Sequence, residues 1–148
     1  MKKLLLLMLT IVLAACSAVQ PKSDFDRARE TWQDAKISHY RFNVFVSCFC
    51  VFNEDMPLII EVKDGEVVSM EFKSGKEIDA ANLEYFQRFA TVDKLFEEIE
   101  KDQNGEADKV TVEYDATYGF PTKIDIDFIE QAVDDELYLT ISNFEAIP

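Results

Sequence analysis

Two cysteines one residue apart, Cys48 and Cys50, are the side chains of this sequence whose type and spacing best suit them to chemistry. The surrounding alternation is typical of a β-strand, so both would lie on one strand face, about 6.6–6.8 Å apart between Cα atoms. A disulfide needs Cβ atoms about 3.8 Å apart, so bonding requires a bulge or a bend here. Three uses stay open: a disulfide, two buried thiols, or a reactive pair that exchanges disulfides or captures a soft metal.

The start of the chain indicates export to the cell envelope. The charged beginning Met1-Lys2-Lys3 precedes an apolar run from Leu4 to Ala15 that is too short to span a bilayer, as in a secretory signal. The run ends in Leu13-Ala14-Ala15-Cys16, which resembles the lipobox of bacterial lipoproteins, where a signal peptidase cuts before a cysteine that carries diacylglycerol. We therefore expect residues 1–15 to be a signal peptide and Cys16 to be lipidated. The alternative is an ordinary secretory signal that ends near a cysteine.

Residues 16–23 then form a short tether, so we expect membrane contact through the lipid anchor alone. Ser17 follows the lipidated cysteine, which resembles the sorting signal of outer-membrane lipoproteins in bacteria with two membranes. In such an organism we expect the protein on the outer membrane, facing the periplasm. Exported compartments are oxidising, which favours a disulfide between Cys48 and Cys50 over the two other uses.

The net charge of the protein limits the classes of molecule that it can bind. Cleavage after residue 15 removes two lysines and leaves 13 basic against 29 acidic side chains, a net charge of −16. Nucleic acids and anionic lipid headgroups need clustered lysine and arginine, so both are excluded as partners. The sequence has a single histidine, His39, and lacks a phosphate-binding loop, a nucleophile elbow and a Cys/His metal set. We expect no enzyme, no catalytic residue and no cofactor.

An acidic stretch offers a weak candidate for calcium binding. It places oxygen ligands at positions 1, 3, 5 and 9 of a calcium-type loop: Glu100, Asp102, Asn104 and Asp108. Position 12 is Thr111, which cannot supply the bidentate carboxylate, so the alternative is an ordinary capped helix end. Further along, the carboxylates of Asp125 and Asp127 alternate with apolar residues, as on a solvated strand face.

Hydrophobic periodicity predicts one α+β domain over residues 24–148. A helix and three antiparallel strands occur twice and form one antiparallel sheet layer packed by helices. Ser23 caps the first helix, with Asp26 at the third position of a capping box, and Thr91 caps the second. The expected strands are 40–50, 58–62, 67–72, 110–114, 122–128 and 136–144, with residues 73–90 irregular. The repeated order raises the hypothesis of an ancient duplication.

Residues 58–72 predict a β-hairpin around Asp64-Gly65. We prefer a three-residue loop with Gly65 in the left-handed conformation, because it places Met70 opposite Leu58. A two-residue turn would mix apolar and polar residues on the two faces.

The outward face of the first strand carries Phe45, Phe49 and Val51, an unusual apolar content for a solvated face. One interpretation is a protein-binding patch at Phe45 and Phe49, because sizeable exposed apolar areas usually mark interaction sites. The other, which we prefer, is that residues 73–90 fold over this face and bury it beneath their own aromatic side chains.

Motifs spread along the chain carry a resemblance to a known family. They are Cys48-Phe49-Cys50, Val62-Lys63-Asp64-Gly65-Glu66-Val67-Val68, the helix from Thr91 to Ile99, Val112-Glu113-Tyr114-Asp115 with Tyr118-Gly119-Phe120-Pro121, and Ile124-Asp125-Ile126-Asp127. Together they resemble a family of small exported bacterial proteins, domain of unknown function 6174, over nearly all of residues 30–145. Family members often carry proline after the second cysteine, where this chain has Val51. The resemblance implies the fold and an envelope address, and it implies no activity.

We therefore expect a non-enzymatic envelope lipoprotein that binds another envelope protein or modulates an assembly. The alternative is a lipoprotein that handles thiols by redox exchange, or a soft metal, through Cys48 and Cys50.

Overall fold

The computed structural model of the protein describes residues 21–148, so the expected signal peptide and Cys16 lie outside the described residues. The helices are α1 (Asp24–Ala35), α2 (Ala80–Phe86) and α3 (Val92–Lys101). The strands are β1 (His39–Ser47), β2 (Leu58–Lys63), β3 (Glu66–Phe72), β4 (Lys109–Tyr114), β5 (Pro121–Asp127) and β6 (Leu137–Ala146). Within residues 21–148, no helix is long and apolar enough to cross a membrane.

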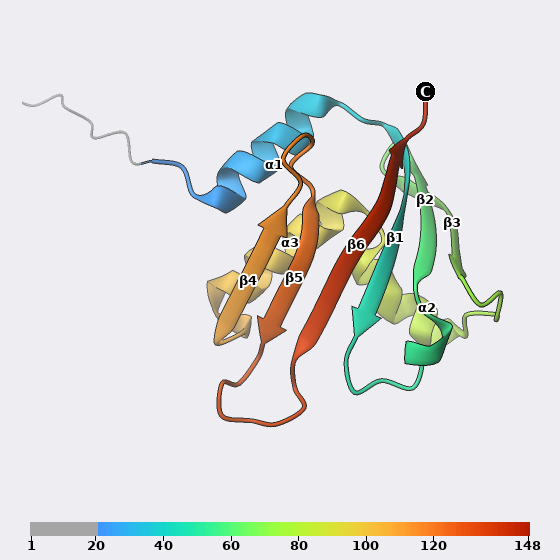
Figure 1. The fold of residues 1–148 in the computed structure, drawn as a ribbon, viewed down its shortest axis with the longest axis vertical. Coiled ribbons are helices and arrows are strands. Elements are labelled where there is room, and N and C mark those ends of the chain that lie inside the picture. The colour runs from blue at the N-terminus through green and yellow to red at the C-terminus, as the bar shows by residue number, and fades with distance from the viewer. Residues whose placement is uncertain (1–20) are drawn as a thin grey trace, which may run out of the picture.

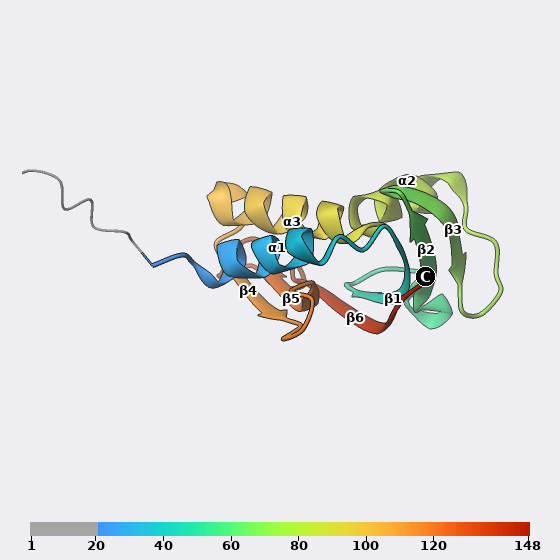
Figure 2. The same ribbon diagram turned by 90° about the horizontal axis from the view of Figure 1, so that it is seen from above.

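The six strands form one antiparallel sheet in the order β3-β2-β1-β6-β5-β4 (Figure 1). All three helices lie on the same face of this sheet, and the described residues leave the other face uncovered (Figure 2). Strand β1 alternates accordingly: Tyr40, Phe42, Val44 and Val46 are buried under the helices. The predicted α+β fold, one antiparallel sheet layer packed by helices, is confirmed.

The two halves of the chain are not rotated copies of each other. Suppose that β1, β2 and β3 are superimposed on β4, β5 and β6 in that order. Each strand then moves three places across the sheet, and because neighbouring strands are antiparallel its direction is reversed. A rotation that does both turns the sheet over, and would place α1 and α3 on opposite faces. Instead both lie on the same face, with the rings of Phe25 and Phe96 in contact at 5.7 Å between centroids. The two halves are therefore not related by a rotation, and the ancient duplication stays a hypothesis.

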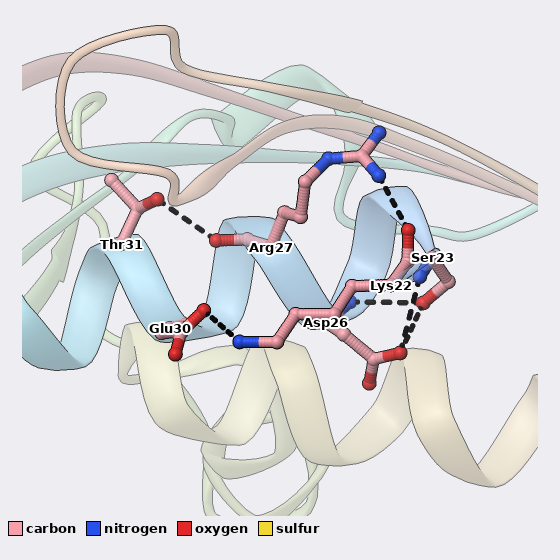
Figure 3. Close-up of polar contacts among 6 residues, drawn as sticks. All are labelled: Lys22, Ser23, Asp26, Arg27, Glu30 and Thr31. Carbon is pink, nitrogen blue, oxygen red and sulfur yellow. Dashed lines mark hydrogen bonds and ion pairs between the residues drawn. The ribbon is translucent and has the colours of Figure 1, made fainter. Parts of the chain in front are cut away.

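The N-terminus of α1 carries the capping box expected from the sequence (Figure 3). The Ser23 hydroxyl accepts a hydrogen bond from the Asp26 N–H at 3.0 Å, and the Asp26 carboxylate accepts from the Ser23 N–H at 3.3 Å. Hydrogen bonds from Ser23 lower the pKa of the Asp26 carboxyl. Lys22 and Glu30 form an ion pair beside the cap. The first helix therefore begins at a defined residue, directly after the expected tether.

Helix α1 packs closely over the turn between β4 and β5. Gly119 has a φ of +79°, and a Cβ at this position would collide with the carbonyl oxygen of Ala28 in α1. Beside it, the rings of Phe120 and Phe144 stack with centroids 4.4 Å apart. The Asp115 carboxylate accepts two backbone N–H groups of the turn, at 2.9 and 2.7 Å. We call residues 115–121 with α1 the closed end of the sheet.

Residues 73–90 fold onto the helix-covered face, not onto the outward face. Asp79 caps α2 by accepting from the Asn82 N–H at 2.9 Å, so a short helix replaces the expected irregular segment. Phe86 and Phe89 are both fully buried, and the Phe86 ring packs against Phe52 at 4.8 Å between centroids. Our preferred expectation that this segment covers the outward face is wrong, because the core beneath α2 takes up its aromatic side chains.

Helix α3 begins where two hydroxyl groups meet its free N–H groups. Thr91 accepts from the Lys94 N–H at 3.1 Å, as the sequence predicts for its cap. The buried hydroxyl of Tyr40, from β1, accepts from the Val92 N–H at 3.1 Å. Burial raises the pKa of Tyr40 to about 12, so the phenol stays neutral at physiological pH. These bonds fix α3 over the centre of the sheet.

The β2–β3 hairpin turns through two residues, Asp64-Gly65, with φ of +53° and +82°, as in a type I′ turn. Met70 pairs with Ile60, so the predicted three-residue loop and the pairing of Met70 with Leu58 are wrong. The register shifts at Val68, which is the extra residue of a β-bulge and is 59% exposed. The bulge keeps the apolar side chains of β3 on the buried face of the sheet, although the turn has only two residues.

Candidate binding surface at the loop end of the sheet

Strand β1 ends at Ser47, and both cysteines lie in the loop that follows. Cys48 and Cys50 are joined by a disulfide with Cα atoms 5.1 Å apart, and the Cys50 N–H donates to the Cys48 carbonyl oxygen at 2.7 Å. The structure therefore pairs the cysteines at a break in the strand, as the preferred interpretation expected. The expectation that the strand runs to residue 50 is wrong, because an extended strand holds such a pair too far apart. Their redox state in the cell envelope stays a prediction.

The disulfide loop turns two apolar side chains into solvent. Phe49, between the cysteines, is 93% exposed, and Val51 is 94% exposed. The cysteines themselves are partly buried against the core, and Phe52, the next aromatic residue, is fully part of it. The Asn53 amide also donates to the Cys48 carbonyl oxygen at 2.8 Å. The loop is thus held at its base while its tip stays in water.

The loop between β5 and β6 lies at the same end of the sheet as the disulfide loop (Figure 1). It carries two further exposed apolar side chains. Ile129 is 58% exposed and Val133 is 82% exposed. The Asp135 carboxylate accepts the Ile129 N–H at 2.8 Å, and the Asp108 carboxylate accepts the N–H of residue 130 at 3.0 Å. We call residues 48–52 and 128–136 together the loop end.

The two loops face each other across a shared hollow. It has a volume of about 310 Å³ and is lined from the first loop by both cysteines and Phe49, and from the second by Phe128, the acidic residues 134–136 and Leu137. Tyr85, from α2, and Arg88, from the turn that follows α2, also line the hollow. Residues far apart in the sequence therefore form one continuous surface.

The loop end is strongly acidic. Its carboxylates and those of the adjoining strand residues are Asp108, Asp125, Asp127, Glu130, Asp134, Asp135 and Glu136. Within residues 21–148, none of these seven forms an ion pair with a lysine, arginine or histidine. Partial desolvation and repulsion by Asp135 and Glu136 raise the pKa of Asp127. The cluster therefore carries a net negative charge.

Arg88 is the cation nearest to the disulfide in this hollow. It donates to Glu98 at 2.5 Å, and its guanidinium lies 5.3 Å from the centroid of the Phe89 ring. The hydrogen bond to Glu98 raises the pKa of Arg88. Sequence reasoning missed this neighbour, because the contact joins two segments about forty residues apart and no local motif encodes it.

The calcium candidate is not assembled. Within residues 21–148, no three Asp, Glu, His or Cys side chains are placed to hold a metal ion. The Glu100 carboxylate accepts a hydrogen bond from Arg29 at 2.9 Å in an ion pair, and the Asp108 carboxylate accepts the N–H of residue 130 in the loop end. Asn104 is exposed, while Asp102 is buried at 1% exposure with both carboxylate oxygens lacking a hydrogen-bond partner. The stretch is the end of α3, as the alternative expected.

The outward face of the sheet holds the remaining residues singled out from the sequence. Phe45 is 39% exposed there and pairs across the strands with Thr140. His39 contacts Glu61 at 2.8 Å between Nε2 and Oε1, which gives it a structural partner. The structure thus leaves Phe45 and Phe49 accessible, Phe45 on the sheet and Phe49 in the loop end.

Comparison with known proteins identifies the fold's family. Residues 24–146 match the model of the Family of unknown function (DUF6174). The chain belongs to this family. The match covers every helix and strand described above, so the DUF6174 fold includes both loops of the loop end. For this DUF6174 protein, no curated protein and no solved structure gives a match.

Proposed function

We propose that this DUF6174 protein is a non-enzymatic envelope lipoprotein that binds another protein through its loop end. The chain is anchored by acyl chains on Cys16, on the outer membrane facing the periplasm where the organism has two membranes. The expected lipobox and the short tether support the anchoring, and the −16 net charge of the mature chain argues against nucleic acid and anionic lipid as partners.

The observation that carries the proposal is the group of four exposed apolar side chains on two adjacent loops. Phe49, Val51, Ile129 and Val133 are each more than half exposed. Single exposed apolar residues are common on monomeric proteins, but a cluster of them on facing loops is typical of an interaction site.

The loops are also held in place before any partner arrives. A disulfide closes one, and hydrogen bonds from backbone N–H groups to Asp135 and Asp108 order the other. Ordering a loop in advance reduces the entropy lost on binding, which favours recognition by a fixed surface.

Site-directed photocrosslinking in the native envelope tests the proposal. A photoreactive phenylalanine analogue is placed at Phe49 or Val133, with Val68 as the matched exposed control on β3. We expect one protein adduct shared by positions 49 and 133 and absent at 68. Adducts that are equal at all three positions, or absent at all three, would reject binding through the loop end.

Lipidation is tested separately. Radiolabelled fatty acid should enter the wild-type protein and not Cys16→Ser, because the cleaved lipobox cysteine is the acylation site. Equal labelling of both proteins would show that Cys16 is not the lipidated residue and would favour the alternative, an ordinary secretory signal.

A second candidate function is thiol–disulfide exchange at Cys48 and Cys50. The observation that favours it is the position of Arg88 in the same hollow, because a nearby cation lowers the pKa of a thiol and makes the thiolate available. Two observations weigh against it: Arg88 is already paired with Glu98, and residues 134–136 bring carboxylates to the other side.

Replacing both cysteines with serine separates the two candidates. A binding module should keep a crosslink from position 133 in this variant, since Phe49 and Val133 are both retained. A redox protein should lose all function in this variant. The single substitution that removes the resolving cysteine, Cys48→Ser or Cys50→Ser, should then trap the mixed disulfide that the wild-type protein resolves.

A further inference from the structure

We infer that the partner of the loop end is a protein segment with apolar side chains flanked by lysine or arginine. This inference rests on the proposed function and adds the chemistry of the partner. It follows from the way in which exposed apolar side chains and unpaired carboxylates share one surface.

The apolar part of this surface needs an apolar complement. Phe49 and Val51 project from the disulfide loop, and Ile129 and Val133 project from the loop opposite. Covering them removes apolar area from water, which supplies the non-directional part of the binding free energy. A buried aromatic side chain is the usual energetic anchor of a protein contact, and Phe49 is the exposed aromatic residue of this surface.

The charged part needs a cationic complement. Seven carboxylates lie at or beside these side chains, and within residues 21–148 none is in an ion pair. A second hollow of about 190 Å³ continues onto the outward face of β4–β6, where Asp125, Asp127 and Glu136 line it beside Lys109. Arginine or lysine from a partner would relieve the repulsion among these groups and would form charge-assisted hydrogen bonds.

Other occupants fit less well. An anionic membrane would meet apolar side chains that could insert, but also the repulsion of the whole acidic cluster. A second copy of this chain would bring the same carboxylates against themselves, because a two-fold interface pairs identical patches. A basic and apolar protein segment satisfies both parts of the surface.

Binding of defined peptides tests the inference. The probe is an amphipathic helical peptide of leucine and lysine, compared with a leucine and glutamate peptide of the same length, by fluorescence anisotropy at about 0.15 M salt. The protein begins at residue 16 and carries Cys16→Ser. The loop-end variant is Glu130→Gln, Asp134→Asn and Glu136→Gln, whose side chains make no hydrogen bond within residues 21–148.

A matched variant controls for net charge. Glu66→Gln, Glu71→Gln and Glu77→Gln, on and after β3, change the charge by the same amount at exposed positions far along the sheet. We expect the loop-end variant to bind the leucine and lysine peptide about tenfold more weakly, and the control less than twofold more weakly. We also expect Phe49→Ser with Val133→Ser to weaken binding, and Val68→Ser to leave it unchanged.

The other possible outcomes show whether the inferred partner chemistry or the proposed function has failed. Equal weakening by both charge variants, or equal binding of the glutamate peptide, would overturn the inference as a net-charge effect. Binding of the wild-type protein to phosphatidylcholine vesicles that is lost in Phe49→Ser would assign the surface to lipid. A protein adduct from position 49 without any binding of the lysine peptide would keep the proposed function and reject the basic partner.

Discussion

The two ends of the sheet use similar residues for opposite purposes. At the closed end, Phe120 stacks on Phe144 and Gly119 lies against the backbone of α1, so the turn between β4 and β5 is packed from both sides. At the loop end, Phe49 stands between two cysteines with almost its whole surface in water.

The difference lies in what each turn packs against. The closed end has a helix above it, so its aromatic side chains are removed from water. The loop end extends past the helices, and within residues 48–52 and 128–136 only Phe52 is buried, through contacts with α2. Whether an aromatic residue in a loop is buried or exposed therefore depends on the element that lies beside it. The comparison makes four predictions about stability.

The largest effect is expected from Phe120→Ala at the closed end. Phe120 is 5% exposed and stacks on Phe144, so truncation loses apolar burial and leaves a cavity. The free energy of unfolding should fall by about 3–5 kcal/mol, measured by urea denaturation. A loss below about 1 kcal/mol would show that the closed end is not packed as described.

Gly119→Ala should come next. The new methyl group would meet the Ala28 carbonyl oxygen, and the residue would have to keep a φ of +79°. We expect a loss of about 2–4 kcal/mol. Gly75→Ala is the matched control, because its φ is +78° but its surroundings are open. It should cost only the strain of the left-handed conformation, about 1 kcal/mol. Equal losses in both variants would show that α1 moves to make room for the new methyl group.

Much of this fold could be predicted from the sequence because its signals are local. The capping box at Ser23, the cap at Thr91 and the alternation in the strands each act over a few residues, and all three predictions hold. The predictions that failed depended on tertiary packing. The bulge at Val68 and the destination of Phe86 are decided by which face the core can fill, and a local pattern does not specify that.

The candidate site shows the same division. The expected oxidising compartment favours pairing of Cys48 with Cys50, although their spacing on a strand requires a break there. The exposure of Ile129 and Val133 does not follow, because two apolar residues in a polar loop are as readily tucked inward as left outside. Only the three-dimensional arrangement brings their loop beside the loop of Phe49.

A third, opposite effect is expected at Asp102, which is buried although its carboxylate has no hydrogen-bond partner. Burial, with repulsion from Glu98, raises its pKa above the ordinary value of 3.8. The folded state thus binds this proton more tightly than the unfolded chain, so the contribution of Asp102 to stability is greatest at low pH and is lost as the pH rises through the raised pKa. Asp102→Asn should stabilise the protein by about 1–2 kcal/mol at pH 7.

Urea denaturation at pH 7 and below pH 4 checks this, with the exposed Asp34→Asn as control. The gain from Asp102→Asn should shrink at the acidic pH, where Asp102 becomes protonated in the unfolded as well as the folded state, and Asp34→Asn should change little at either pH. A gain of the same size at both values would mean that the charge of Asp102 is not the cause.

The smallest effect on stability is expected from Phe49→Ala, the same substitution as at Phe120 placed at the opposite end of the sheet. Because Phe49 is 93% exposed, truncation removes little buried area and leaves no cavity, so the free energy of unfolding should change by less than about 0.5 kcal/mol. Phe45→Ala should lie between the two, since Phe45 is 39% exposed. Recovery of the crosslinked partner from position 133 should nevertheless fall in Phe49→Ala. A loss of several kcal/mol would place this ring in the core and remove it from the binding surface, whereas unchanged stability with unchanged crosslinking would leave Phe49 outside the contact.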